Sequence, residues 1–229
     1  MFFWDWSIFL VIPPFILAIY AQSRVKNTYA KFSRGPAASR ISGAEAARRI
    51  LSASGAGNVP VERTKGRLSD HYDPQKKVLR LSEGVHDSQS LAALGIAAHE
   101  AGHAIQHAQG YAPLQLRNTL FPVANLGSTL AFPLFFIGFL FSRNSPSILM
   151  DIGIFLFAGA VLFSVLTLPV EFDASKRAMA LLKDTGFLRG EELNGARSVL
   201  SAAALTYVAS TAMAAMQLVR MFILRGSRD

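Results

Sequence analysis

Two long stretches of the chain contain no charged residue, and they restrict the possible folds more than any other feature. Residues 118–142 and 152–170 are mostly apolar and are separated by a short turn. A helix needs about 20 such residues to cross a bilayer, and lipid cannot satisfy the hydrogen bonds of an irregular backbone. We therefore expect two transmembrane helices joined as a hairpin, with the connecting loop outside.

Residues 6–23 form a shorter uncharged stretch near the amino terminus. Trp4, Trp6 and Tyr20 lie near its two ends, where aromatic side chains favour the membrane interface. A cleaved signal peptide is disfavoured because the basic residues follow the apolar stretch instead of preceding it. We expect an uncleaved first span with an outside amino terminus and a kink at Pro13-Pro14.

A further uncharged stretch, residues 200–219, is rich in Ala, Ser, Thr and Met. It fits either a fourth span packed through small side chains or an apolar helix lying against the catalytic unit. Arg220, Arg225 and Arg228 follow it and disfavour outward export of the tail. The sequence thus predicts three to four spans.

The composition agrees with a membrane protein. Hydrophobic residues make up 51% of the chain and charged residues 17%, against about a quarter charged in typical soluble domains. The net charge is +8, with a basic excess between Arg24 and Arg117. No nucleic-acid motif accompanies this excess, so we expect no nucleic-acid partner and a cytoplasmic location for this segment. Residues Arg24–Arg40 lie against anionic headgroups or form a solvated linker.

The segment before the predicted hairpin has the pattern of a small α+β unit. Ser42 with Glu45 three residues later is a capping box for a helix through about Ala53. Residues 59–82 indicate short strands around a turn at Asp73-Pro74. The edge of such a sheet can pair with an extended substrate or serve only in structural packing.

A second helix, capped by Asp87 or Ser88, carries a His-Glu-x-x-His motif: His99, Glu100 and His103. Residues four apart share a helix face, so both imidazoles can bind one metal ion. Zinc suits them and keeps a position open for water, whose proton Glu100 can accept. In the alternative interpretation, this is an alanine-rich core helix whose two histidines have hydrogen-bond partners and bind no metal.

A third ligand is needed, and the chain has no cysteine, so the ligand must be His, Asp or Glu. His107 lies a further helical turn along, about 5.4 Å away, which places it in an outer layer or on the surface. Glu171 is the better candidate, because it follows a span directly, beside Pro169, where an unpaired charge is costly. In the alternative interpretation, Glu171 is an interfacial carboxylate that pairs with Lys176 and binds no metal.

Four motifs together resemble those of the YugP-type membrane zinc metallopeptidases of bacteria. The layout is also similar to the HtpX-type and CaaX-prenyl proteases, in which two spans separate the His-Glu-x-x-His helix from a ligand glutamate. The motifs are Asp70-His71-Tyr72-Asp73-Pro74, Leu81-Ser82-Glu83-Gly84-Val85, Ala98–His107 and Pro169–Ser175.

This resemblance implies that His99, His103 and Glu171 are zinc ligands and that Glu100 is the catalytic base. Gluzincins often have Asp four residues after the ligand glutamate, where it bonds a ligand histidine. That position is Ser175 here, with Asp173 two residues after the glutamate. The group that orients the ligand histidines is therefore left open.

The expected fold is a mainly α membrane protein of three to four transmembrane helices with a small α+β zincin-like catalytic unit and a short β-sheet. Residues 1–229 would form a single unit whose catalytic portion covers about 41–117 and 171–199. The expected activity is a zinc-dependent endopeptidase acting on protein or peptide substrates at the cytoplasmic face of a bacterial cell membrane. His71 or Tyr72 would stabilise the oxyanion.

Two alternative functions differ in what they require of the motif. An intramembrane-cleaving zinc protease would bury His-Glu-x-x-His in a span and carry a downstream Leu-Asp-Gly motif, which does not occur in the sequence. A non-catalytic metal-binding scaffold of the membrane would not need Glu100. The endopeptidase is therefore favoured, while its substrate and oligomeric state do not follow from the sequence.

Overall fold

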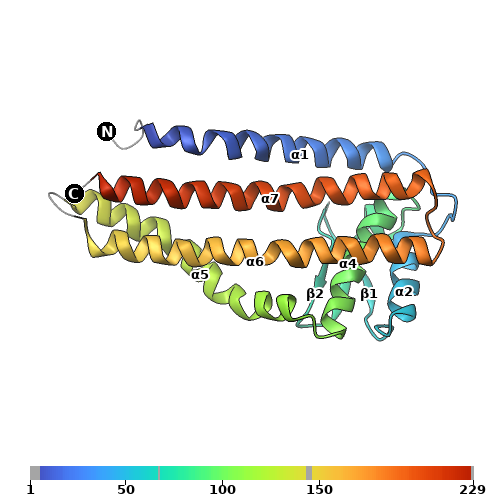
Figure 1. Ribbon diagram of the computed structural model, residues 1–229. Helices are drawn as coiled ribbons and strands as arrows, with labels where there is room; N and C mark the ends of the chain where they lie inside the picture. Colours follow the sequence, from blue (N-terminus) through green and yellow to red (C-terminus); the bar gives the residue numbers. More distant parts are fainter. Residues whose placement is uncertain (1–5, 67, 143–145, 228–229) are drawn as a thin grey trace. The chain divides into compact units, whose positions relative to one another are not determined.

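The computed structural model describes residues 6–66, 68–142 and 146–227. The predicted interfacial Trp4, the start of the predicted hairpin loop at 143–145, and Arg228 lie outside these ranges. Within them the chain is mainly helical, with four helices long and apolar enough to cross a membrane and one three-stranded sheet (Figure 1). The expected fold class, a mainly α membrane protein with a short β-sheet, is confirmed.

The chain forms two compact units. The first contains Met1–Ala21, Leu116–Pro169 and Thr206–Asp229. The second contains Gln22–Gln115 and Val170–Leu205. Each unit has its own buried apolar cluster, so each is described separately.

The four long helices differ in their bounds from the uncharged stretches that predicted them. A 3-10 turn, η1, leads into the first of them. The fourth helix, uninterrupted over residues 200–219, is apolar enough for a span. The bounds are η1 Trp6–Leu10, α1 Ile12–Phe32, α5 Ala112–Phe141, α6 Ile148–Asp184 and α7 Glu191–Gly226.

The predicted kink at Pro13-Pro14 falls where the 3-10 turn η1 gives way to α1. Both prolines stand in the first turn of α1, which begins at Ile12 after η1. Backbone N–H groups in a first turn have no partner within the helix, so proline loses nothing there and its fixed φ suits the start of a helix. The two prolines therefore stand where the α-helix begins.

In the first unit, glycines allow α5 and α6 to approach closely. A Cβ on Gly153 would lie 2.7 Å from the Ala131 carbonyl oxygen, and one on Gly138 would lie 2.7 Å from the Met150 nitrogen. Small residues serve this purpose in membrane helices, where close packing replaces the hydrophobic effect. Large apolar side chains such as Phe155, 78% exposed, cover the outside, as lipid-facing residues do.

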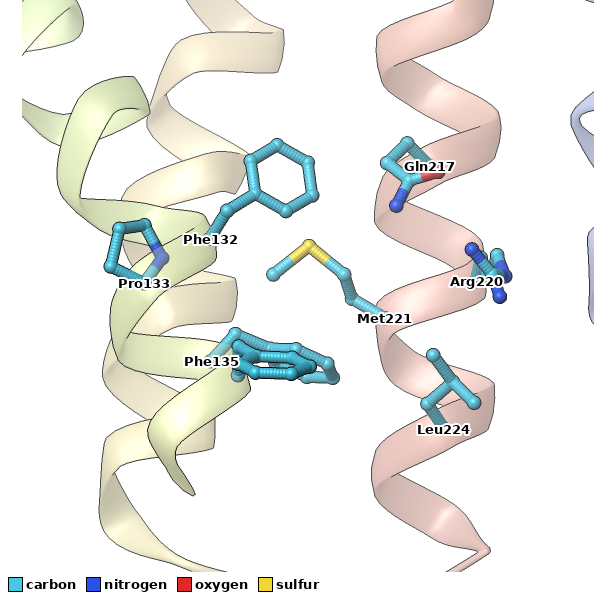
Figure 2. Close-up of a pocket in the computed structure, with 8 residues that line it drawn as sticks. Phe132, Pro133, Phe135, Gln217, Arg220, Met221 and Leu224 are labelled. Carbon is cyan, nitrogen blue, oxygen red and sulfur yellow. The ribbon is translucent and has the colours of Figure 1, made fainter. Parts of the chain in front are cut away.

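A pocket of about 320 Å³ lies between α5 and α7 in this unit. Met221 of α7 points between Phe132 and Phe135 of α5 (Figure 2). Arg220 also lines the pocket and donates a hydrogen bond from Nε to Ser7 Oγ at 3.3 Å. The pocket is thus almost wholly apolar, with its polar groups on α7.

The second unit packs three shorter helices, the carboxyl-terminal part of α6 and the amino-terminal part of α7 with a small sheet. Strands β1 and β3 are parallel, while β2 and β3 form an antiparallel hairpin, giving the order β1-β3-β2. The buried cluster includes Leu51, Leu79, Leu94 and Leu182. The bounds are α2 Gly43–Ala53, β1 Val61–Thr64, β2 His71–Asp73, β3 Val78–Ser82, α3 Glu83–His86 and α4 Leu91–Ala108.

Two predictions made from the local sequence are confirmed in this unit. Ser42 Oγ accepts a hydrogen bond from the Glu45 backbone at 3.2 Å, which confirms the cap of α2. The predicted turn at Asp73-Pro74 is confirmed too, and Asp73 Oδ1 accepts from the backbone N–H groups of Gln75 and Lys76, each at 3.0 Å.

The predicted cap of the motif helix is wrong. Ser90 is the cap of α4, and its Oγ accepts from the Ala93 backbone at 3.2 Å. Asp87 instead pairs with Arg63, and Ser88 Oγ accepts from the Ser90 backbone. These contacts hold residues 87–90 out of the helix, which therefore begins at Leu91.

The contacts of Asp73 in the turn after β2 lead us to predict that the stability of the fold depends on pH. The hydrogen bond from the Lys76 backbone, assisted by Arg80, lowers the pKa of Asp73 below its ordinary value. A carboxyl with a lowered folded pKa stabilises the fold above its unfolded pKa, about 4, and this stability is lost as the pH falls further. Between pH 5 and pH 3, we expect the melting temperature of the wild type to fall more than that of Asp73→Asn, measured in detergent. Equal falls would contradict this role.

Candidate metal centre

His99 and His103 share one face of α4, as the motif spacing predicted. Their ring centroids are 4.8 Å apart with planes at 84°, so the two Nε2 atoms can converge on one point. The helix around them is tightly packed, since Ala97, Ala98 and Ala101 are fully buried. Small side chains on α4 let its neighbours come close to the imidazoles.

Glu171 of α6 lies against both histidines. Its Oε2 is 3.3 Å from His99 Nε2 and 3.5 Å from His103 Nε2, and Glu171 is only 2% exposed. Ligand atoms of the three residues all lie within 4.8 Å of one another. Tetrahedral zinc with bonds of about 2.0–2.1 Å places its ligand atoms about 3.4 Å apart, so two of the three separations already fit zinc.

The approach of α6 to α4 depends on Gly102. A Cβ at this position would lie 2.9 Å from the Ala174 carbonyl oxygen and 3.4 Å from the Ala174 Cα. Backbone atoms cannot move aside as a flexible side chain can. Gly102 therefore lets the turn of α6 that bears Glu171 lie directly against the histidines.

The outer nitrogen of each histidine has a partner. Ser175 Oγ lies 3.1 Å from His99 Nδ1, so the residue four positions after Glu171 does contact a histidine of the motif. Gln106 Oε1 lies 3.0 Å from His103 Nδ1. Gln106 was missed by sequence reasoning, although a glutamine three residues after His103 shares its face of the helix.

Gln106 in turn contacts α6. Its Nε2 donates to the Val170 carbonyl oxygen at 2.9 Å and to Asp173 Oδ2 at 2.8 Å. Arg177 Nε donates to the same Asp173 oxygen at 2.5 Å. Asp173 therefore belongs to the histidine network through Gln106 and not by direct contact.

Glu100 faces the sheet. Its Oε2 accepts a hydrogen bond from the Tyr72 backbone N–H at 3.1 Å. Burial lowers the pKa of His103, but the hydrogen bond with Glu171 and the charges of Glu100 and Glu171 outweigh it, and the net pKa is raised. The two carboxylates thus make this buried site favourable for a cation.

The remaining candidates have hydrogen-bond partners outside the three clustered side chains. Tyr72 Oη is 2.7 Å from His107 Nδ1, so these two residues partner each other. His71 is exposed, and its Nδ1 lies 2.8 Å from the Ser69 carbonyl oxygen. The oxyanion role assigned to His71 or Tyr72 stays a prediction.

Comparison with known proteins identifies the family of this chain. The family model described as "Putative neutral zinc metallopeptidase" matches residues 7–226, and the chain belongs to this family of zinc metallopeptidases. The curated "Putative membrane protease YugP" of Bacillus subtilis (strain 168) is 47% identical over 225 residues, covering 97% of this chain and 98% of that protein. No solved structure matches the chain. The resemblance drawn from the sequence motifs is therefore confirmed.

Gly102 provides a test of how α6 is positioned. We expect Gly102→Ala to lower the stability by about 1–3 kcal/mol through overpacking and to weaken zinc binding, because Glu171 is displaced from the histidines. The measurements are the melting temperature in a chelator and zinc affinity by competition.

The matched control is Gly95→Ala on the same helix. A Cβ on Gly95 would lie 3.5 Å from the Ala196 Cβ, an ordinary contact, so this change should leave zinc affinity unchanged. Equal behaviour of the two variants would show that the close approach at Gly102 is not needed.

Proposed function

We propose that this protein is a zinc-dependent endopeptidase that hydrolyses peptide bonds of protein or peptide substrates at the cytoplasmic face of a bacterial cell membrane. The observation that carries the proposal is the buried cluster of His99, His103 and Glu171, with Glu100 on the same helix. Two imidazoles and one carboxylate are the ligand set of zinc peptidases that keep one position for water. The family of the chain and its membrane-protease relative support the same activity.

Each residue has a defined chemical task. His99 Nε2, His103 Nε2 and Glu171 would hold the zinc ion. When bound, zinc polarises the substrate carbonyl and lowers the pKa of water. The Glu100 carboxylate accepts the proton of the attacking water and passes it to the leaving amine. A scaffold that only retained metal would have no use for this carboxylate.

Strand β2 supplies a place for an extended substrate. One side of β2 pairs with β3, while the Tyr72 N–H on its other side points to Glu100. A substrate added as a further strand along this side would replace Glu100 as the acceptor of the Tyr72 N–H and bring its backbone beside the Glu100 carboxylate. The substrate is thus an unfolded or extended segment, recognised mainly through its backbone.

The cytoplasmic orientation is supported by the charge of the second unit. The segment between Arg24 and Arg117, nearly all of which belongs to this unit, carries the basic excess, and basic loops are retained on the cytoplasmic side. Four helices of membrane-spanning length would anchor the enzyme in the bilayer.

Replacement of Glu100 tests the mechanism. Glu100→Gln keeps the size of the side chain but cannot accept the proton, so casein hydrolysis should fall by about 10²–10⁴-fold while bound zinc stays at the wild-type level. Glu83→Gln, an exposed glutamate of the same unit, is the control and should change neither quantity. Unchanged hydrolysis by Glu100→Gln would refute the catalytic role.

A further inference from the structure

The side-chain amide of Gln106 has only one orientation that satisfies its surroundings. Its two nearest groups on α6, the Val170 carbonyl oxygen and the Asp173 carboxylate, can only accept hydrogen bonds. The NH₂ group, with two protons to donate, must therefore face α6. Gln106 is 0% exposed, so water does not offer an alternative partner, and Oε1 is left to face His103.

This orientation decides how His103 is protonated. An oxygen that faces His103 Nδ1 at 3.0 Å accepts, so Nδ1 must carry the proton. In a neutral imidazole the lone pair then lies on Nε2, the atom that faces Glu171. His99 differs, because the Ser175 hydroxyl at its Nδ1 can donate or accept and so leaves either tautomer possible.

The same amide also holds the third ligand. Val170 and Asp173 lie on the two sides of Glu171 in the sequence of α6, and Gln106 bonds both. Asp173 is fixed further by Arg177, which also donates to Gln109 Oε1 on the end of α4. Gln106 thus links the geometry of His103 to the position of the Glu171 segment.

We propose that Gln106 is a positioning residue of the metal centre: its amide fixes His103 in the tautomer that presents Nε2 to the metal, and it holds the Glu171 segment against that histidine. This inference rests on the proposed function, since it assumes that the cluster binds zinc. It assigns to Gln106 the orienting task that the sequence left open between Ser175 and Asp173.

Two substitutions of Gln106 separate this role from simple packing. Gln106→Met removes the acceptor, and zinc affinity should fall by about 10–100-fold, as for other groups that orient ligand histidines. Gln106→Glu keeps an acceptor towards His103 but turns carboxylate oxygens towards Val170 and Asp173. It should therefore lower the melting temperature in a chelator and weaken zinc binding less than Gln106→Met does, because His103 keeps its acceptor and only the hold on the Glu171 segment is lost.

The experiment uses full-length protein in detergent, with zinc affinity measured by chelator competition and Gln75→Met, an exposed glutamine, as the control. Wild-type affinity in Gln106→Met, or an equal loss in Gln106→Glu, would overturn the inference. Glu171→Ala should lose zinc; full retention there would instead refute the proposed metal centre itself.

A measurement on the wild type does not depend on how the variants fold. In ¹⁵N NMR of the zinc-loaded protein, His103 should bind through Nε2 and show a slowly exchanging Nδ1 proton, because that proton is bonded to a buried amide oxygen. Binding through Nδ1, or rapid exchange of that proton, would contradict the role of Gln106.

Discussion

The burial of the Glu171 carboxylate against two imidazoles is the interaction on which the chemistry of this protein depends. A buried carboxylate costs several kcal/mol unless charge and hydrogen bonds compensate it. His99 and His103 lie close enough to do so, and a divalent cation between the three residues would do so better. The absence of a side chain at Gly102 allows this arrangement, because any Cβ there would meet the backbone of α6.

Features that depend on local sequence could be predicted. Uncharged stretches such as 118–142 indicate membrane helices because the bilayer imposes a length and an apolar composition. The spacing of His99 and His103 fixes a shared helix face without any knowledge of the tertiary fold. Glu171 was the preferred candidate for the third ligand because a charge next to a span is costly unless it is paired or bound. The structure brings this residue to the two histidines.

Features that depend on packing between distant segments could not be predicted. The contacts of Ser175 with His99 and of Gln106 with Asp173 join α4 to α6, and no local pattern specifies such pairs. The cap of α4 was misplaced because Asp87 and Ser88 are good caps by residue type but have other partners in the fold. Pro13 and Pro14 show a related ambiguity, because a proline pair suits the first turn of a helix, where the structure places it.

The central claim is that two histidines and one glutamate bind a single zinc ion. X-ray absorption spectroscopy of the purified full-length protein tests it most directly, because the imidazole ring gives a distinct scattering pattern around the metal. We predict one zinc per chain, bound by two imidazoles and by oxygen ligands at about 2.0–2.2 Å. A spectrum with three imidazoles, which would bring in a histidine such as His107, or with none, would contradict the account.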